Sequence, residues 1–134
     1  MIHCLALVIL MTLTAPADTS ATLPPCPASP NCVSSQAADS HRIEPFNITG
    51  DAGTAFEKLR RILARRGDAT MISADETMLV VEFRTTLGFV DDGLFVLDAA
   101  NGLIQVRSAA RLGYWDMGKN RRRMEEIRHS FLAE

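Results

Sequence analysis

The chain has 134 residues and a formal net charge of −2 at pH 7, and this length suits a single domain. Hydrophobic residues make up 47% of it and charged residues 22%, which is a globular composition and excludes a wholly disordered chain. The small negative charge also does not suggest a general nucleic-acid binder, so we expect no nucleic-acid partner.

The N-terminal segment has the pattern of a signal peptide. Residues 5–13 form a nearly unbroken apolar run, which is shorter than the roughly 20 residues that a membrane-spanning helix needs. Ala15 and Ala17 supply the small residues that a signal peptidase reads. We therefore predict a signal peptide over residues 1–17, an exported periplasmic or cell-envelope protein, and a mature chain without a transmembrane span. The alternative is an N-terminal strand or a buried core segment.

Two cysteines, Cys26 and Cys32, remain after this cleavage. Such a close pair predicts a disulfide in an oxidising compartment. The alternatives are a redox-active pair, or a zinc site with His41 that would lack a fourth ligand. Residues 18–45 are rich in Ala, Ser, Thr and Pro and have no apolar period. We predict that they form an extended arm, pinned by the disulfide, that makes one unit with a domain over residues 46–134.

The first predicted helix begins at Thr54. Thr54 and Glu57 have the spacing of a capping box, and the apolar residues that follow recur at helical intervals. These residues are Phe56, Leu59, Ile62 and Leu63.

Alternating or apolar runs then predict four strands, at residues 70–74, 78–85, 89–97 and 103–109. The links between them are short, which favours an antiparallel meander. A second amphipathic helix is predicted over residues 120–133. The predicted fold is α+β, with two layers: a four-stranded antiparallel meander packed by two amphipathic helices in the order α-β-β-β-β-α, and an extended N-terminal arm.

Asp91 and Asp92 interrupt the apolar third strand. Neighbours in a strand point to opposite faces, so at least one carboxylate is expected on the core side, where it needs a cation or several donors. The alternative is that the pair marks a bulge or strand end beside Gly93. Arg107 and Arg111, on the neighbouring strand and the start of the next loop, are the natural partners.

The segment 107–128 is locally basic, with seven Lys and Arg residues against three acidic ones. Arginine binds carboxylates and phosphates in bidentate fashion. Two interpretations of this basic segment remain. The cations either form internal ion pairs, for which Asp116 is also available, or line a pocket for an anion. The loop 113–118 holds the only tyrosine, Tyr114, and the only tryptophan, Trp115, which either cap the core or clamp a partner.

Three motifs resemble one family. They are CPASPNCVSS at residues 26–35, GFVDD at residues 88–92, and RSAARLG at residues 107–113, which continues through Asp116, Gly118, Asn120, Arg121 and Arg123. In this order they are similar to the bacterial and plastid domain-of-unknown-function family DUF1499, over about residues 26–131. The chain has Ala110 where the family often has serine, and Trp115 where it often has a small polar residue. The resemblance implies export and a fold but no reaction.

The sequence has no serine-hydrolase elbow, phosphate loop, dinucleotide fingerprint or metal-helix motif. We therefore expect a non-enzymatic envelope module, without cofactor or metal, that binds an anionic ligand or an envelope protein. The alternative is a small enzyme with Asp91 or Asp92 as acid or base and Arg107 and Arg111 holding an anionic substrate. The candidate binding residues are Asp91, Asp92, Arg107, Arg111, Tyr114, Trp115, Asp116, Asn120, Arg121 and Arg123.

Overall fold

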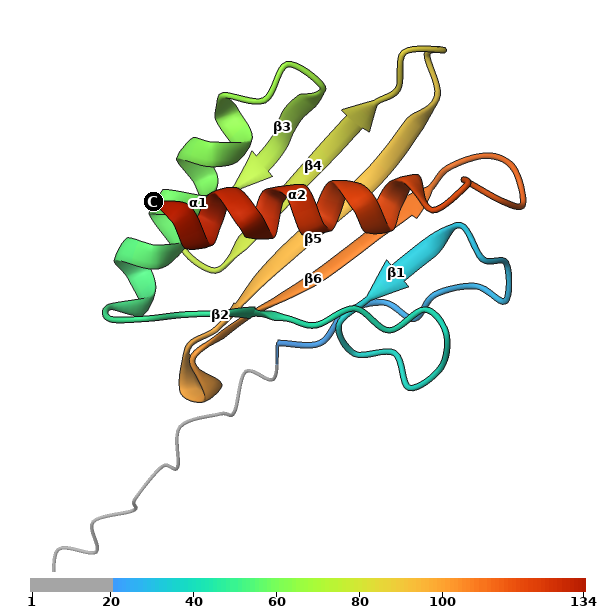
Figure 1. Ribbon diagram of the computed structural model, residues 1–134. Coiled ribbons are helices and arrows are strands. Elements are labelled where there is room, and N and C mark those ends of the chain that lie inside the picture. Colours follow the sequence, from blue (N-terminus) through green and yellow to red (C-terminus); the bar gives the residue numbers. More distant parts are fainter. Residues whose placement is uncertain (1–20) are drawn as a thin grey trace, which may run out of the picture.

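A computed structural model describes residues 21–134, so the predicted signal peptide lies outside the described residues. Figure 1 shows the helices packed against a twisted sheet. In chain order the elements are β1 (Cys32–Ser34), β2 (Phe46–Asn47), α1 (Ala52–Ala64), β3 (Ala69–Ala74), β4 (Met78–Arg84), β5 (Val90–Asp98), the 3-10 turn η1 (Ala99–Asn101), β6 (Leu103–Ala110) and α2 (Lys119–Ala133).

The sheet is antiparallel and has six strands, in the order β1-β6-β5-β4-β3, with β2 also pairing with β6. The meander of four consecutive strands, β3 to β6, is therefore confirmed. The predicted strand number is wrong, because the N-terminal part of the chain adds β1 and β2. These strands have three and two residues, too few to show a period of two. They satisfy backbone groups that the outer edge of β6 would otherwise leave unpaired.

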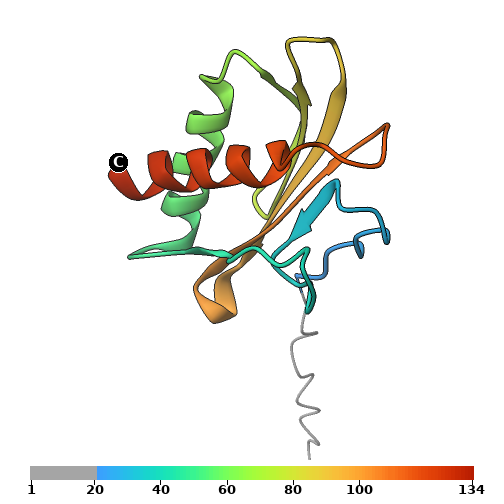
Figure 2. The ribbon, with the colours of Figure 1, turned by 45° about the vertical axis from the view of Figure 1, so that its right-hand side comes forward.

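Both helices bury their apolar stripes on one face of the sheet. Leu79 and Val81 of β4, Phe95 of β5 and Val106 of β6 form this core with Leu59 of α1. From α2 it receives Met124, Ile127 and Phe131. The two-layer arrangement of helices on a sheet is as predicted, and it is seen from the side in Figure 2.

Helix α1 begins earlier than predicted, because Asp51 and not Thr54 is its N-cap. The Asp51 carboxylate accepts hydrogen bonds from the backbone N–H and the hydroxyl of Thr54, both at 2.8 Å. In the predicted capping box the Thr54 side chain would instead have accepted a hydrogen bond from the N–H of Glu57, one turn further on. Asp51 caps the free N–H groups of the turn before it.

The first described residues cover part of the opposite sheet face. Ala21 and Leu23 pack against Val96 and the half-buried Leu94 of β5. The disulfide between Cys26 and Cys32 joins this segment to β1. The disulfide prediction is confirmed, and the zinc alternative is wrong because both thiols are consumed. Within residues 21–134 no helix is both long and apolar enough to cross a bilayer.

Candidate functional site

Asp91 and Asp92 point to opposite faces of β5. Asp91 pairs in register with Phe83 and Ala110 on the helix side of the sheet, and only 3% of its surface is exposed. Asp92 pairs with Glu82 and Ala109 on the other side, where 46% of its side chain is exposed. The expectation that one carboxylate faces the core is confirmed, and that carboxylate is Asp91.

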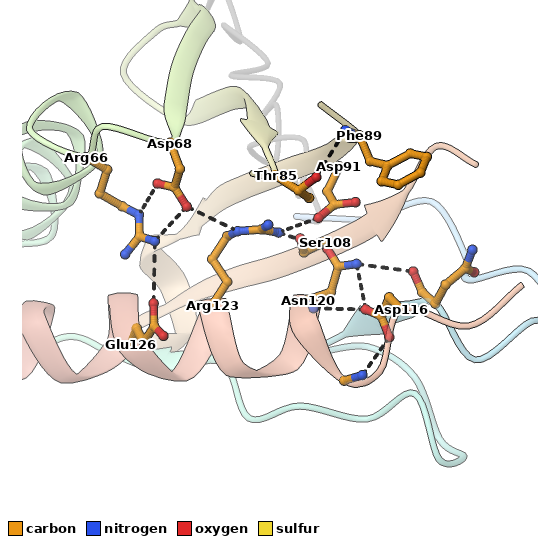
Figure 3. A network of polar contacts seen from close by, with 12 residues as sticks. Arg66, Asp68, Thr85, Phe89, Asp91, Ser108, Asp116, Asn120, Arg123 and Glu126 are labelled. Carbon is orange, nitrogen blue, oxygen red and sulfur yellow. Dashed lines mark hydrogen bonds and ion pairs between the residues drawn. The ribbon is translucent and has the colours of Figure 1, made fainter. Parts of the chain in front are cut away.

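A row of alternating positive and negative side chains lies between α2 and the sheet (Figure 3). Arg123 Nη1 lies 2.8 Å from Asp91 Oδ2, and Arg123 Nε lies 3.6 Å from Asp68 Oδ2. Arg66 then donates two hydrogen bonds to Asp68, at 2.8 and 2.9 Å. Burial opposes the ionisation of Asp68, but Arg66 and Arg123 outweigh it and hold the pKa of this carboxyl below its usual value.

The contact between Asp91 and Arg123 is an ion pair without hydrogen-bond geometry, since Asp91 Oδ2 is buried and accepts no hydrogen bond. The Arg123 guanidinium also stacks on Phe83, 4.6 Å from the ring centre. Gly93 leaves room for this ring, because a Cβ at Gly93 would lie 2.4 Å from Phe83 Cε2. The glycine therefore belongs to the site, although it carries no functional group.

Asn120 connects this row to the loop before α2. Its Oδ1 accepts hydrogen bonds from Ser108 Oγ at 2.5 Å and from Arg123 Nη1 at 3.3 Å. Its Nδ2 donates to Asp116 Oδ2 at 2.8 Å and to the carbonyl of Asn31 at 3.5 Å. Asn120 is fully buried, so it fixes the start of α2 against β6 and the segment before β1.

Asp116 caps α2 and does not pair with an arginine as predicted. It accepts hydrogen bonds from the backbone N–H groups of Gly118 and Asn120, each at 2.9 Å. Burial opposes its ionisation, but these donors outweigh burial and keep the pKa of Asp116 below its usual value. Gly118 has φ of 73°, a left-handed conformation that glycine adopts without steric cost.

An open cavity of about 270 Å³ lies between two loops. Residues 85–89 join β4 to β5, and residues 111–118 join β6 to α2; together we name them the loop end. Asp91 and Ala110 line the cavity from the sheet, and Lys119 lines it from the start of α2. Its remaining walls are mainly exposed apolar side chains of the loop end: Leu87, Phe89, Leu112, Trp115 and Met117.

Arg107 and Arg111, the predicted partners of the two aspartates, lie on the face of the sheet opposite to Asp91. Arg111 donates to Asp92 at 2.7 and 3.0 Å and to Glu82 at 2.8 Å, and these carboxylates raise its pKa. Arg107 donates to the carbonyl of Pro25 at 3.2 Å, while its buried Nε has no hydrogen-bond partner. Burial lowers the pKa of Arg107, and the charge of Asp92 opposes this effect.

The structure thus divides the predicted site residues. Asp91, Asp116, Asn120 and Arg123 form the buried network, and Trp115 lines the cavity beside it. The remaining candidates lie elsewhere: Asp92, Arg107 and Arg111 on the other sheet face, Tyr114 exposed beside the cavity, and Arg121 bound to the carbonyls of Ser40 and Arg42.

Sequence reasoning missed several residues of this region. Leu87 and Phe89 could have been found, because large apolar residues on both sides of a glycine at a hairpin tip are expected to be exposed. Asp68 offered no signal, because only the fold places it beside Arg123. The missed residues are Asn31, Arg66, Asp68, Leu87, Phe89, Ser108, Leu112, Met117 and Lys119.

The fold and site define a small α+β domain with a buried polar network beneath an open apolar cavity. The chain belongs to the family described as protein of unknown function (DUF1499), which it matches over residues 22–131. No curated protein and no solved structure shows significant similarity to it. Among residues 21–134, His, Cys, Asp and Glu side chains form no group of three or more that could hold a metal ion.

Proposed function

We propose that this chain is a non-enzymatic protein of the cell envelope, exported by its N-terminal segment, that binds the apolar part of a ligand or partner at the loop end. One observation carries the proposal. Of the nine exposed large hydrophobic side chains among residues 21–134, six lie in the loop end. They are Leu87, Phe89, Leu112, Tyr114, Trp115 and Met117, with exposed fractions from 53% to 85%.

Clustered exposed apolar side chains mark binding sites more often than scattered ones. Full burial of each such side chain is worth about 1.5–3 kcal/mol, so covering several would supply a useful affinity after the cost of association. The network beneath supports this use. Hydrogen bonds between Asn120 and Asp116 hold the loop before α2 in place, and this loop forms one wall of the cavity.

The arginines first considered for an anion have internal partners. Arg111 is bound by Asp92 and Glu82, and Arg123 by Asp91 and Asp68. An external anion would have to displace carboxylates that are always present. This favours an apolar ligand over an anion held by these residues.

The enzyme alternative needs Asp91 or Asp92 beside Arg107 and Arg111, but the two aspartates lie on opposite faces of the sheet. Arg107 and Arg111 share the face of Asp92, whereas the cavity is on the side of Asp91. Asp91 is also held by Arg123 as half of an ion pair. The arrangement supports binding better than acid–base chemistry.

The ligand site is tested with the neutral fluorescent probe N-phenyl-1-naphthylamine. Ala110→Phe places a large side chain in the cavity, whereas Ala100→Phe makes the same change at an exposed position of η1. We expect probe binding by the native chain and by Ala100→Phe, and a loss of at least about tenfold in affinity for Ala110→Phe. Equal binding by both variants would show that the cavity is not the site.

Export is tested separately by N-terminal sequencing of the protein from the envelope fraction. We expect a chain that begins at or near Asp18. Recovery of the protein from the cytoplasm with Met1 retained would refute this part of the proposal.

A further inference from the structure

The loop end lies at one extremity of the molecule. Figure 1 shows the β4–β5 hairpin and the loop before α2 projecting from the same end of the sheet, while the β5–β6 turn and the first described residues lie toward the other. Loops 85–89 and 111–118 contribute to one cavity and are therefore side by side. Nothing else among residues 21–134 covers their apolar side chains, which range from 53% to 85% exposed.

Unpaired cations flank these apolar side chains. Arg84 precedes the first loop, and Lys119 and Arg122 follow the second. None of the three forms an ion pair within residues 21–134, although Arg122 donates to the carbonyl of Met117 at 2.6 Å. Lys119, Arg122 and Arg123 also border a second hollow, of about 260 Å³, which Arg66 lines together with the carboxylates of Asp68 and Glu126.

The acidic groups nearby are already engaged. Arg123 neutralises Asp91, and Arg111 neutralises Asp92. The Asp116 carboxylate accepts hydrogen bonds from the N–H groups at the start of α2. Residues 85–89 and 111–118 themselves hold one cation, Arg111, and one anion, Asp116, so the positive charge beside the loop end comes from the flanking Arg84, Lys119 and Arg122, in a chain whose net charge is −2.

We infer that the loop end docks on the surface of an anionic lipid bilayer. This rests on the proposed function and names its partner. Apolar tips with Trp and Tyr suit the boundary between headgroups and acyl chains. Arg84, Lys119 and Arg122 then lie at the level of the lipid phosphates, which attract cations near the surface.

The exposed fractions favour a bilayer over a single small ligand. A small ligand inside the cavity would cover only those parts of the side chains that face it, and Leu87, Leu112 and Trp115 have 85%, 74% and 68% of their surfaces exposed. The cavity volume also lies slightly below the range of about 300–1,000 Å³ that is usual for small-molecule sites. A bilayer surface covers all the tips at once.

The experiment uses Trp115, which is the only tryptophan, as its reporter. The protein is mixed with vesicles of phosphatidylglycerol and phosphatidylcholine, or of phosphatidylcholine alone. We expect a blue shift of the Trp115 emission, and co-sedimentation, with the anionic vesicles only, both weakened by added salt. Unchanged emission with anionic vesicles, or equal binding to neutral ones, would overturn the inference.

Variants then locate the surface. Leu87→Ser should weaken vesicle binding by about tenfold, while Leu132→Ser, at a 64% exposed position in the last turn of α2, should not. Each of Arg84→Gln, Lys119→Gln and Arg122→Gln should weaken it about fivefold. Arg61→Gln, on exposed α1 surface, is the matched control. Equal losses in variant and control would place the contact elsewhere.

A second titration separates this inference from the proposed function. If N-phenyl-1-naphthylamine binds and Ala110→Phe abolishes its binding, but anionic vesicles leave Trp115 unchanged, the apolar site stands and the bilayer is the wrong partner. If neither the probe nor the vesicles bind, both proposals are wrong.

Discussion

Asp91 and Asp92 are neighbours in β5, and each faces an arginine, but the two pairs lie in different surroundings. Asp91 and Arg123 are under α2, with 4% and 3% of their side chains exposed. Asp92 and Arg111 lie on the open face, with 46% and 48% exposed. Two Asp–Arg pairs of the same kind are therefore expected to differ in how much they matter for stability. The inner pair is costly to break, because either partner alone would be a buried charge, whereas water solvates either partner of the outer pair.

The largest effect is expected from Asp91→Asn. This change leaves Arg123 buried beside a neutral amide and should lower the free energy of unfolding by about 3 kcal/mol. Urea denaturation measures it, and Asp92→Asn is the matched control one residue away. Equal destabilisation by the two variants would contradict the distinction between the faces.

Gly93→Ala tests the packing that holds the inner pair. A Cβ at Gly93 would displace the Phe83 ring, on which the Arg123 guanidinium stacks. Overpacking of this kind should cost about 2 kcal/mol, again by urea denaturation. Gly67→Ala is the control, since a Cβ there meets nothing within 4 Å. A neutral Gly93→Ala would show that the ring moves without cost.

The sequence predicted the meander and both helices because their periods extend over many residues. The alternation from Leu79 to Phe83 and the stripe through Met124 and Ile127 each record one buried face. β1 and β2 could not be predicted, because strands of three and two residues carry no period and depend on the free edge of β6.

The candidate site was predicted in part for a similar reason. The pleat of β5 sends one of two adjacent aspartates inward, which was predictable. Which arginine meets it was not, because Arg107 and Arg111 are close to Asp91 in the predicted hairpin, while Arg123 arrives from α2 by tertiary packing. Asp68 and Asn31 come from still more distant segments.

Acid should weaken the inner network through Asp68. The pKa of Asp68 is below its usual value in the folded chain, so its contribution is complete above the unfolded pKa of about 3.9 and is lost as the pH falls through the folded pKa. Asp68→Asn should therefore flatten the fall of stability with acid, by less than about 1.4 kcal/mol per pH unit, the slope for one full proton. Urea denaturation at a series of acidic pH values measures this slope. An unchanged slope would show that Asp68 ionises alike in the folded and unfolded chains.

The smallest effect is expected at the outer pair, and it should depend on salt. Arg111 bridges Asp92 and Glu82, but all three groups contact water, so Asp92→Asn should cost roughly a third or less of what Asp91→Asn costs. Salt screens exposed charges over a Debye length of about 10 Å at 0.1 M. The destabilisation caused by Asp92→Asn should therefore vanish at high ionic strength, whereas the destabilisation caused by Asp91→Asn should persist. A double-mutant cycle of Asp92→Asn with Arg111→Gln, at low and high salt, isolates the pair energy. A coupling that survives high salt would mean that the outer pair is shielded from water, for example by another molecule bound to the open face.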